Sequence, residues 1–275
     1  RDDVESRGLG DVYKRQAVIG LPFIVMTLVF ANIYIVDLVF ALIAIMCLHE
    51  YMSSFKEKAK PVFWVGYMAC LLISIINIIP EQYKVVTIQV SICTIIAILF
   101  IQSIITNMKY SIIDIAITLF GICYIPLFLI YIPKTIGAEN GNILIWYLFI
   151  ASWGTDIFAY TIGKKFGKHK FSKISPNKSI EGCIGGAVGA ILIALIYTYA
   201  INKFFGMNIN YIFISGIALL LSIIGQIGDF AASSVKRYVG IKDFSNLLPG
   251  HGGMLDRFDS LIFIAPFAYF LLILL

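Results

Sequence analysis

The chain has 275 residues, of which 60% are hydrophobic and 13% are charged, and its mean hydropathy is +0.91. This composition excludes an ordinary soluble globular domain, in which about a quarter of the residues are charged. The net charge of +5 is explained by basic loops beside anionic lipid headgroups. We therefore expect a polytopic membrane protein whose partner is the lipid bilayer, with no nucleic-acid partner.

The chain opens with a polar segment, residues 1–16, that contains no apolar run. It is not a signal peptide, and its string GLGDVYKRQ resembles translated sequencing-adapter read-through. We therefore expect 1–16 to be a non-native leader. The remainder is expected to comprise N-terminal transmembrane helices over 17–140 and a C-terminal catalytic region over 141–275, with cytoplasmic loops at 163–182 and 236–258.

Apolar runs follow one another through the rest of the chain. A membrane-spanning helix needs about 20 mostly apolar residues, and continuous runs of Ile, Leu and Phe lack the alternation of an outer-membrane strand. Because helices then satisfy the backbone within a bilayer, the predicted fold class is all-α. Nine transmembrane helices are predicted, at 17–34, 35–52, 61–79, 85–105, 111–132, 143–162, 183–202, 211–232 and 259–275.

Basic residues are divided unequally between the two faces of this arrangement. If the helices alternate in direction, the loops of one face hold 16 Lys and Arg residues and those of the other hold 3, with Arg1 and Arg7 left out of the total of 21. The positive-inside rule assigns the basic face to the cytoplasm. We therefore expect a cytoplasmic N-terminus, a location in the bacterial cytoplasmic membrane and both polar loops on the cytoplasmic side.

The first polar cluster lies at the end of the eighth predicted helix. Ser233, Lys236 and Arg237 follow Asp229 at offsets of four, seven and eight, which are positions on one helical face. A lone carboxylate at depth costs about 2.5–3.5 kcal/mol or more, so Asp229 is expected to face a wet cavity, a cation or both. A pair with Lys236 on the same helix is the simpler alternative, although two turns exceed the usual spacing for such pairs.

The second cluster is a glycine-rich turn, Leu248 to Gly253, followed by charged residues. Its proline stops a helix, and its three glycines allow backbone N–H groups to approach an anion. His251 is expected to donate a hydrogen bond in this turn rather than to act as an acid or base. Residues 256–260 are expected in the first turn of the last helix, where carboxylates offset the positive helix end.

The third polar segment begins with Asp156 at a helix end and continues through the lysine-rich loop 163–182. A Ser-Pro turn in this loop presents Lys178 before the next helix. A plain solvated basic loop is the alternative reading of these lysines. Glu50 follows His49 but lacks the second His of a zinc-protease helix, so we expect it to be a helix-end or packing group.

Asp229 and Asp256 are two carboxylates expected beside the glycine-rich turn and a group of cations. Mg²⁺ is typically held by one or two carboxylates while substrate phosphates complete its coordination, and lysines and arginines neutralise phosphate oxygens. The sequence therefore predicts Mg²⁺ at Asp229 and Asp256, with or without a monovalent cation, and phosphoryl or nucleotidyl transfer. The cations concerned are Lys236, Arg237, Lys242 and Arg257.

The segment from Ser233 to Asp259 resembles, without a gap, the signature of phosphatidate cytidylyltransferases, also called CDP-diacylglycerol synthases. The matching pattern is S-x-V-K-R, four residues, K-D-x-S, two residues, L-P-x-H-G-G-M-x-D-R-F-D. The resemblance extends to Asp156-x-x-Ala-Tyr-x-x-Gly and to Ser175-Pro-x-Lys-Ser-x-Glu-Gly182, and so covers about the C-terminal half. The chain departs from the family's usual Ser-Pro-Lys-Lys-Thr-Trp-Glu-Gly at Asn177, Ser179 and Ile180.

The resemblance implies an enzyme of phospholipid biosynthesis that condenses CTP with phosphatidic acid to give CDP-diacylglycerol and pyrophosphate. It implies catalytic roles for Asp229, Lys236, Arg237, Asp256 and Arg257. It implies substrate contacts from Asp156, Ser175, Lys178, Ser179, Ser233, Lys242, Asp243, His251, Gly252, Gly253 and Asp259. A homodimer is left open.

Two other functions fit parts of this pattern. Another CTP-dependent membrane lipid enzyme, such as a polyprenol kinase or an archaeal-type lipid cytidylyltransferase, would use similar polar groups with a different acceptor lipid. An ion-coupled transporter would also carry intramembrane carboxylates. The charged groups of this sequence lie at predicted helix ends and in loops, which favours an enzyme over a transporter.

Overall fold

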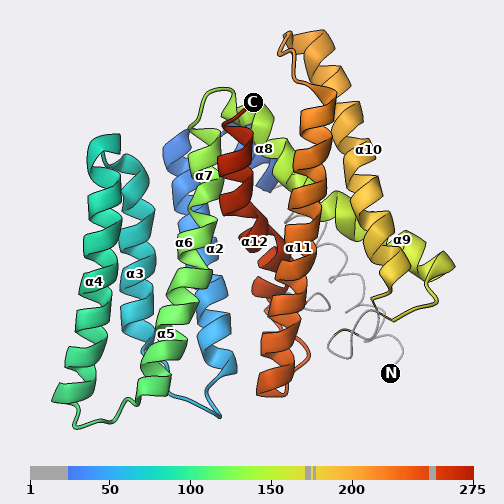
Figure 1. Cartoon of the computed structure of the whole chain (residues 1–275). Helices are drawn as coiled ribbons and strands as arrows, with labels where there is room; N and C mark the ends of the chain where they lie inside the picture. The colour runs from blue at the N-terminus through green and yellow to red at the C-terminus, as the bar shows by residue number, and fades with distance from the viewer. Residues whose placement is uncertain (1–23, 171–174, 176–177, 248–251) are drawn as a thin grey trace, which may run out of the picture. The chain divides into compact units, whose positions relative to one another are not determined.

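The computed structural model describes residues 24–170, 175, 178–247 and 252–275. Within these residues the regular structure is helical (Figure 1), apart from isolated bridge positions at Lys170, Ser179 and Gly252, which confirms the all-α fold class. The predicted leader and His251 lie outside the described residues.

The chain divides into two compact units. The N-terminal unit comprises the described residues through Pro133 together with Tyr238–Phe258, and the C-terminal unit comprises Lys134–Arg237 and Asp259–Leu275. The signature segment recognised in the sequence is therefore shared between both units.

The N-terminal unit is built on α2, α3 and α5, which contact one another in pairs (Figure 1). The side chain of Asn32 caps α2 by accepting a hydrogen bond from the Ile35 N–H at 3.0 Å, and Ser111 and Asp114 form a capping box at α5. Pro126 starts α6 at the point where α5 ends. The helices are α2 (Ile33–Ser54), α3 (Phe63–Ile75), the 3₁₀ turn η1 (Ile76–Ile78), α4 (Glu81–Ile105), α5 (Ile112–Tyr124) and α6 (Pro126–Leu129).

The C-terminal unit is organised by the close packing of α9 against α10. A Cβ atom at Gly182 would lie 2.8 Å from the Ala159 carbonyl oxygen, and one at Gly186 would lie 2.8 Å from the Thr155 carbonyl oxygen. Small residues at this four-residue spacing let two helices in a bilayer approach through their backbones. The helices that lie wholly or partly in this unit are α7 (Tyr131–Ile136), α8 (Gly141–Phe149), the π-helical segment η2 (Ile150–Gly154), α9 (Thr155–Phe166), α10 (Ile180–Phe205), α11 (Tyr211–Val239) and α12 (Leu255–Leu272).

Six helical runs of the described residues are long and apolar enough to cross a membrane, and each overlaps a predicted span. They are Ile33–Ser54, Gln82–Ile105, Ile112–Ile136, Gly141–Phe166, Ile180–Phe205 and Tyr211–Val239. A shorter apolar helix, Phe63–Ile78, lies at the third predicted span. The structure thus supports an integral membrane protein, while the count of nine stays a prediction.

The start of the last helix differs from the prediction. α12 begins at Leu255, so Asp256 lies in its first turn, whereas Asp259 and Ser260 lie in the second. The expectation that residues 256–260 all occupy the first turn was therefore wrong. Contacts from a distant residue, Glu50, fix this earlier start.

Candidate functional site

Asp229 on α11 is the centre of a polar cluster in the C-terminal unit. Its Oδ2 atom accepts a hydrogen bond from the Lys178 ammonium group, and the Ser233 hydroxyl lies 3.5 Å from its Oδ1 atom. The side chains of Lys178 and Asp229 are 25% and 23% exposed. The Lys178 ammonium also lies 4.7 Å from the centroid of the Phe230 ring. This salt bridge joins α11 to a loop residue two positions before α10, instead of linking two turns of one helix.

Two further carboxylates lie within electrostatic range of Asp229. They are Asp156 on α9 and Asp259 on α12, and together the three form what we call the carboxylate cluster. Lys178 lies near Asp156, and Lys236 lies near Asp259. Asp259 and Lys236 are buried, with 8% and 9% of their surface exposed, whereas Asp156 is exposed. Like charges crowded in this way favour a bound cation that neutralises them.

Hydroxyl and amide side chains join the helices that carry the carboxylate cluster. The Thr155 hydroxyl donates to the Ser222 hydroxyl at 2.7 Å and so links α9 to α11. The Ser152 and Ser260 hydroxyls share a hydrogen bond of 2.8 Å between η2 and α12. Gln226 on α11 donates to a backbone carbonyl of α10 at 3.2 Å. The sequence analysis did not predict these contacts. A Ser or Thr residue within an apolar helix is a signal for such a contact, because its hydroxyl group can form a hydrogen bond to a neighbouring helix.

The loop between α9 and α10 is held by Glu181. Its carboxylate accepts hydrogen bonds from the backbone N–H groups of Lys168 at 3.2 Å and of His169 at 3.3 Å, and it contacts the His169 Nδ1 atom at 2.6 Å. Ser179 caps α10 by accepting from the Gly182 N–H at 3.1 Å, and the Ser175 carbonyl accepts from the Lys178 N–H at 3.1 Å. These contacts place Lys178 at the end of the loop, next to α11.

Asp256 contacts both described parts of the segment between α11 and α12, residues 240–247 and 252–254, which we call the signature loop. Its Oδ2 atom accepts hydrogen bonds from the backbone N–H groups of Phe244 at 2.8 Å and Gly253 at 2.9 Å. Gly252 has a φ angle of +79°, which glycine adopts without strain. Lys242, Asp243 and Arg257 are exposed. Asp256 thus joins Phe244 and Gly253, which lie in the two described parts of this loop.

Glu50 on α2 also holds the signature loop. Only 4% of its surface is exposed. Its Oε1 atom accepts from the Ser245 hydroxyl at 2.6 Å and the Met254 N–H at 2.9 Å, and its Oε2 atom accepts from the Leu255 N–H at 2.8 Å. The sequence analysis expected Glu50 to be a helix-end or packing group and did not predict this role. An isolated carboxylate in an apolar helix is nevertheless a signal that the residue has a buried polar partner.

The donors available for a metal ion are carboxylate oxygens. Asp229 and Asp256 belong to different units, so their pairing as metal ligands stays a prediction. Among the described residues no group of three or more His, Cys, Asp or Glu side chains is arranged to hold a metal ion by itself. Mg²⁺ needs only one or two carboxylates when waters and substrate phosphates supply its other ligands, so Asp229 and its acidic neighbours fit this ion.

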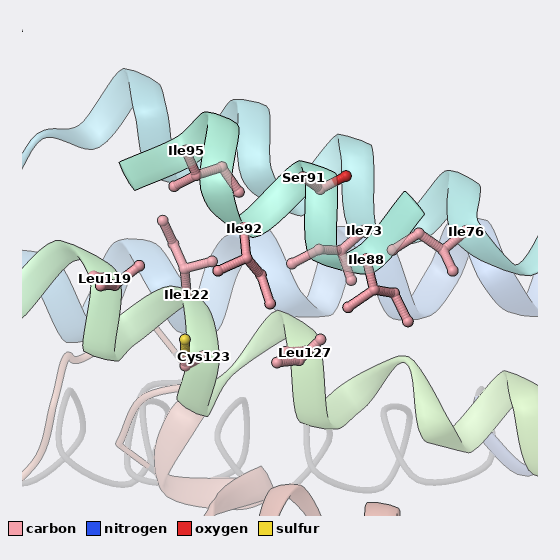
Figure 2. A pocket seen from close by; sticks show the side chains of 10 residues that line it. All are labelled: Ile73, Ile76, Ile88, Ser91, Ile92, Ile95, Leu119, Ile122, Cys123 and Leu127. Atoms are coloured by element: carbon pink, nitrogen blue, oxygen red, sulfur yellow. The ribbon is translucent and has the colours of Figure 1, made fainter. Parts of the chain in front are cut away.

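A separate crevice in the N-terminal unit is apolar. Figure 2 shows isoleucines of α3 and α4 facing Leu119 and Ile122 of α5, with Ser91 and Cys123 as the polar members of its lining. No charged side chain lines this crevice. Its lining therefore offers no charged group to the phosphates of a nucleoside triphosphate.

Comparison with known proteins places the chain in one family. It is 39% identical over 172 residues to a phosphatidate cytidylyltransferase of Staphylococcus aureus (strain COL), covering 62% of this chain and 64% of the relative. It is 46% identical over 137 residues to one of Bacillus subtilis (strain 168), covering 50% of this chain and 49% of the relative. The chain thus spans less than two thirds of the length of these curated relatives. Residues 14–275 match the sequence model of the Cytidylyltransferase family, and the chain belongs to that family.

Proposed function

We propose that this protein transfers the cytidylyl group of CTP to phosphatidic acid, giving CDP-diacylglycerol and pyrophosphate in phospholipid biosynthesis. The observation that carries the proposal is the carboxylate cluster joined to Lys178, in a chain of the Cytidylyltransferase family. The relatives named phosphatidate cytidylyltransferase support phosphatidic acid as the acceptor. Family membership also favours nucleotidyl transfer over ion-coupled transport.

The proposed reaction needs little covalent chemistry from the protein. A phosphate oxygen of phosphatidic acid forms a bond to the α-phosphorus of CTP, the bond from that phosphorus to the oxygen bridging to the β-phosphate breaks, and pyrophosphate leaves. The lipid phosphate is the nucleophile, so no Ser or Cys is required. The protein must position the two substrates and neutralise their phosphates.

The basic residues of both units supply that neutralisation in the proposal. Lys178 is held against Asp229, which orients its ammonium group toward an arriving phosphate oxygen. Lys236 is buried near Asp259, where its charge is little screened by water. Arg237, Lys242 and Arg257 contribute further phosphate contacts.

Asp229, with Asp256 as the second predicted ligand, would hold Mg²⁺. The ion would supply positive charge that stabilises the phosphates during transfer. Asp156 and Asp259 would shape the surroundings of Asp229 and add negative charge that attracts the cation.

The proposed setting is the bacterial cytoplasmic membrane, with nine helices, a cytoplasmic N-terminus and the site on the cytoplasmic side. The unequal distribution of lysine and arginine, the six apolar helical runs and the bacterial relatives support it. Labelling of cysteines introduced at Lys164 and Lys203, which lie in the last turns of the successive helices α9 and α10, tests the orientation. Crosslinking in the same membranes decides whether two chains associate.

Turnover by purified protein tests the reaction. Protein in detergent should convert labelled CTP and phosphatidic acid to CDP-diacylglycerol and pyrophosphate when Mg²⁺ is present, and EDTA should stop the reaction. A complete lack of turnover over a set of phosphatidic acids would refute the proposal. Transfer to a polyprenol or to an archaeal-type lipid instead would refute the acceptor while retaining the use of CTP.

A further inference from the structure

The C-terminal end of α2 contacts both ends of the signature loop within the N-terminal unit. Just beyond α2, the Lys58 ammonium group donates a hydrogen bond to the carbonyl of Tyr238 and lies 4.1 Å from the centroid of its ring. Earlier in the chain, on α2 itself, Glu50 accepts hydrogen bonds from the backbone N–H groups of Met254 and Leu255 at the start of α12. Residues near the end of one helix therefore fix where the loop begins and where it ends.

Glu50 is suited to this contact by its charge and its burial. A buried carboxylate is stable only when its oxygens receive hydrogen bonds, and Glu50 receives three. Two of the donors are backbone N–H groups at the start of α12, which have no partner within the helix and lie at its positive end. A Cβ atom at Gly253 would collide with the Glu50 carboxylate, so glycine is required for the close approach.

The contact also reaches Asp256 through the backbone. Glu50 holds the N–H groups of Met254 and Leu255, and Asp256 holds the N–H group of Gly253 immediately before them. The two carboxylates thus bind three consecutive backbone amides. The Oδ2 atom of Asp256 accepts from the N–H groups of Phe244 and Gly253, so the orientation of its carboxylate depends on the position of this backbone.

We propose that Glu50 is a positioning residue for the reaction. It fixes the signature loop through backbone amides, so that the Asp256 carboxylate is held in one orientation for the reaction. This inference rests on the proposed function for its catalytic part, whereas the anchoring of the loop stands on the hydrogen bonds alone. Glu50 is not required to touch either substrate.

The test compares Glu50→Gln with Glu57→Gln, the same chemical change at an exposed position just after α2. In Glu50→Gln an NH₂ group replaces one carboxylate oxygen. A hydrogen-bond donor then faces the N–H and O–H donors of the loop, so at least one of these hydrogen bonds is lost. Backbone amides of residues 252–258 should exchange with deuterium at least about 10-fold faster than in the wild type. Misplacement of a catalytic group on the ångström scale can lower turnover by about 10²-fold. Loss of a residue that supports a metal ligand without touching the metal typically weakens metal affinity by about 10–100-fold. We expect kcat to fall by about 10²-fold and the Mg²⁺ concentration for half-maximal rate to rise by about 10-fold, with Glu57→Gln unchanged.

Unchanged exchange in Glu50→Gln would overturn the anchoring, and faster exchange with unchanged kcat and Mg²⁺ dependence would overturn the positioning role. Should Glu50→Gln fail to fold, Ser245→Ala removes one donor to the same carboxylate and should shift exchange and kcat in the same direction by less. Wild-type protein without turnover would refute the proposed function and the catalytic part of this inference. The exchange measurement would still decide whether Glu50 anchors the loop.

Discussion

Replacing Asp229 by Asn should separate its part in catalysis from its part in stability. Asn keeps the size of the side chain and one oxygen that accepts hydrogen bonds, but it removes the charge that pairs with Lys178. Loss of one preorganised electrostatic contact typically lowers kcat by about 10²–10³-fold, equivalent to about 2.7–4 kcal/mol of the barrier. We expect kcat/KM to fall by at least that factor, because Asp229 is also a proposed Mg²⁺ ligand.

The effect on stability should be much smaller because two opposing interactions are lost together. A contact ion pair is worth about 4 kcal/mol at an effective dielectric constant of 20. The Lys178–Asp229 pair contributes less, because both side chains are about a quarter exposed and both lose hydration on folding. The variant also relieves repulsion between Asp229 and the carboxylates of Asp156 and Asp259. We therefore expect the free energy of unfolding to change by no more than about 1 kcal/mol.

The assay measures labelled CDP-diacylglycerol together with Tm and monodispersity in one detergent. Asp37→Asn is the matched control, because Asp37 is a carboxylate of a membrane helix that accepts a hydrogen bond from Asn77, which an Asn side chain still permits. Near wild-type kcat/KM in Asp229→Asn would remove Asp229 from the reaction. A fall in activity that follows a fall in Tm would show that the residue acts through folding.

Three further changes test the surroundings of the site. Lys178→Met, which keeps length but removes charge, should lower kcat/KM by about 10²-fold, whereas Lys203→Met, at an exposed position, should leave turnover unchanged. Gly189→Ala should lower stability by about 1–3 kcal/mol in thermal unfolding because its Cβ meets an aromatic ring of α9, whereas Gly216→Ala, whose Cβ meets open space, should not. Glu181→Gln should speed tryptic cleavage between α9 and α10, because an NH₂ group replaces one of the two oxygens that accept hydrogen bonds from backbone N–H groups of that loop; equal cleavage rates would contradict this role.

The positions of the helices could be predicted because the bilayer imposes a simple rule on the sequence. Long apolar runs must become helices in lipid, and the six helical runs of the structure overlap predicted spans. The same reasoning placed Asp229, Ser233 and Lys236 on one helix, and α11 continues through all three. Such inferences need only local spacing, which the sequence contains.

The contacts that assemble the site could not be predicted, because they join segments far apart in the sequence. Nothing local to Asp229 identifies Lys178 as its partner 51 positions away. The start of α12 was misplaced for the same reason, since a hydrogen bond to Leu255 comes from Glu50, 205 positions away. Periodicity places a residue on a helix, but the end of a helix depends on which distant group satisfies its first N–H donors.

The two polar loops use the same device to hold their shape. Glu181 anchors one loop and Glu50 anchors the other, and each does so mainly by accepting hydrogen bonds from backbone N–H groups. A backbone amide is present whatever the side chain at that position, so the loop conformation places little demand on the identity of the lysines and arginines it carries. Those side chains are then selected by what they bind. We therefore expect the shape of the loops and the proposed binding of phosphate to depend largely on different residues, so a change in an exposed loop lysine such as Lys242 should weaken substrate binding without loosening the loop.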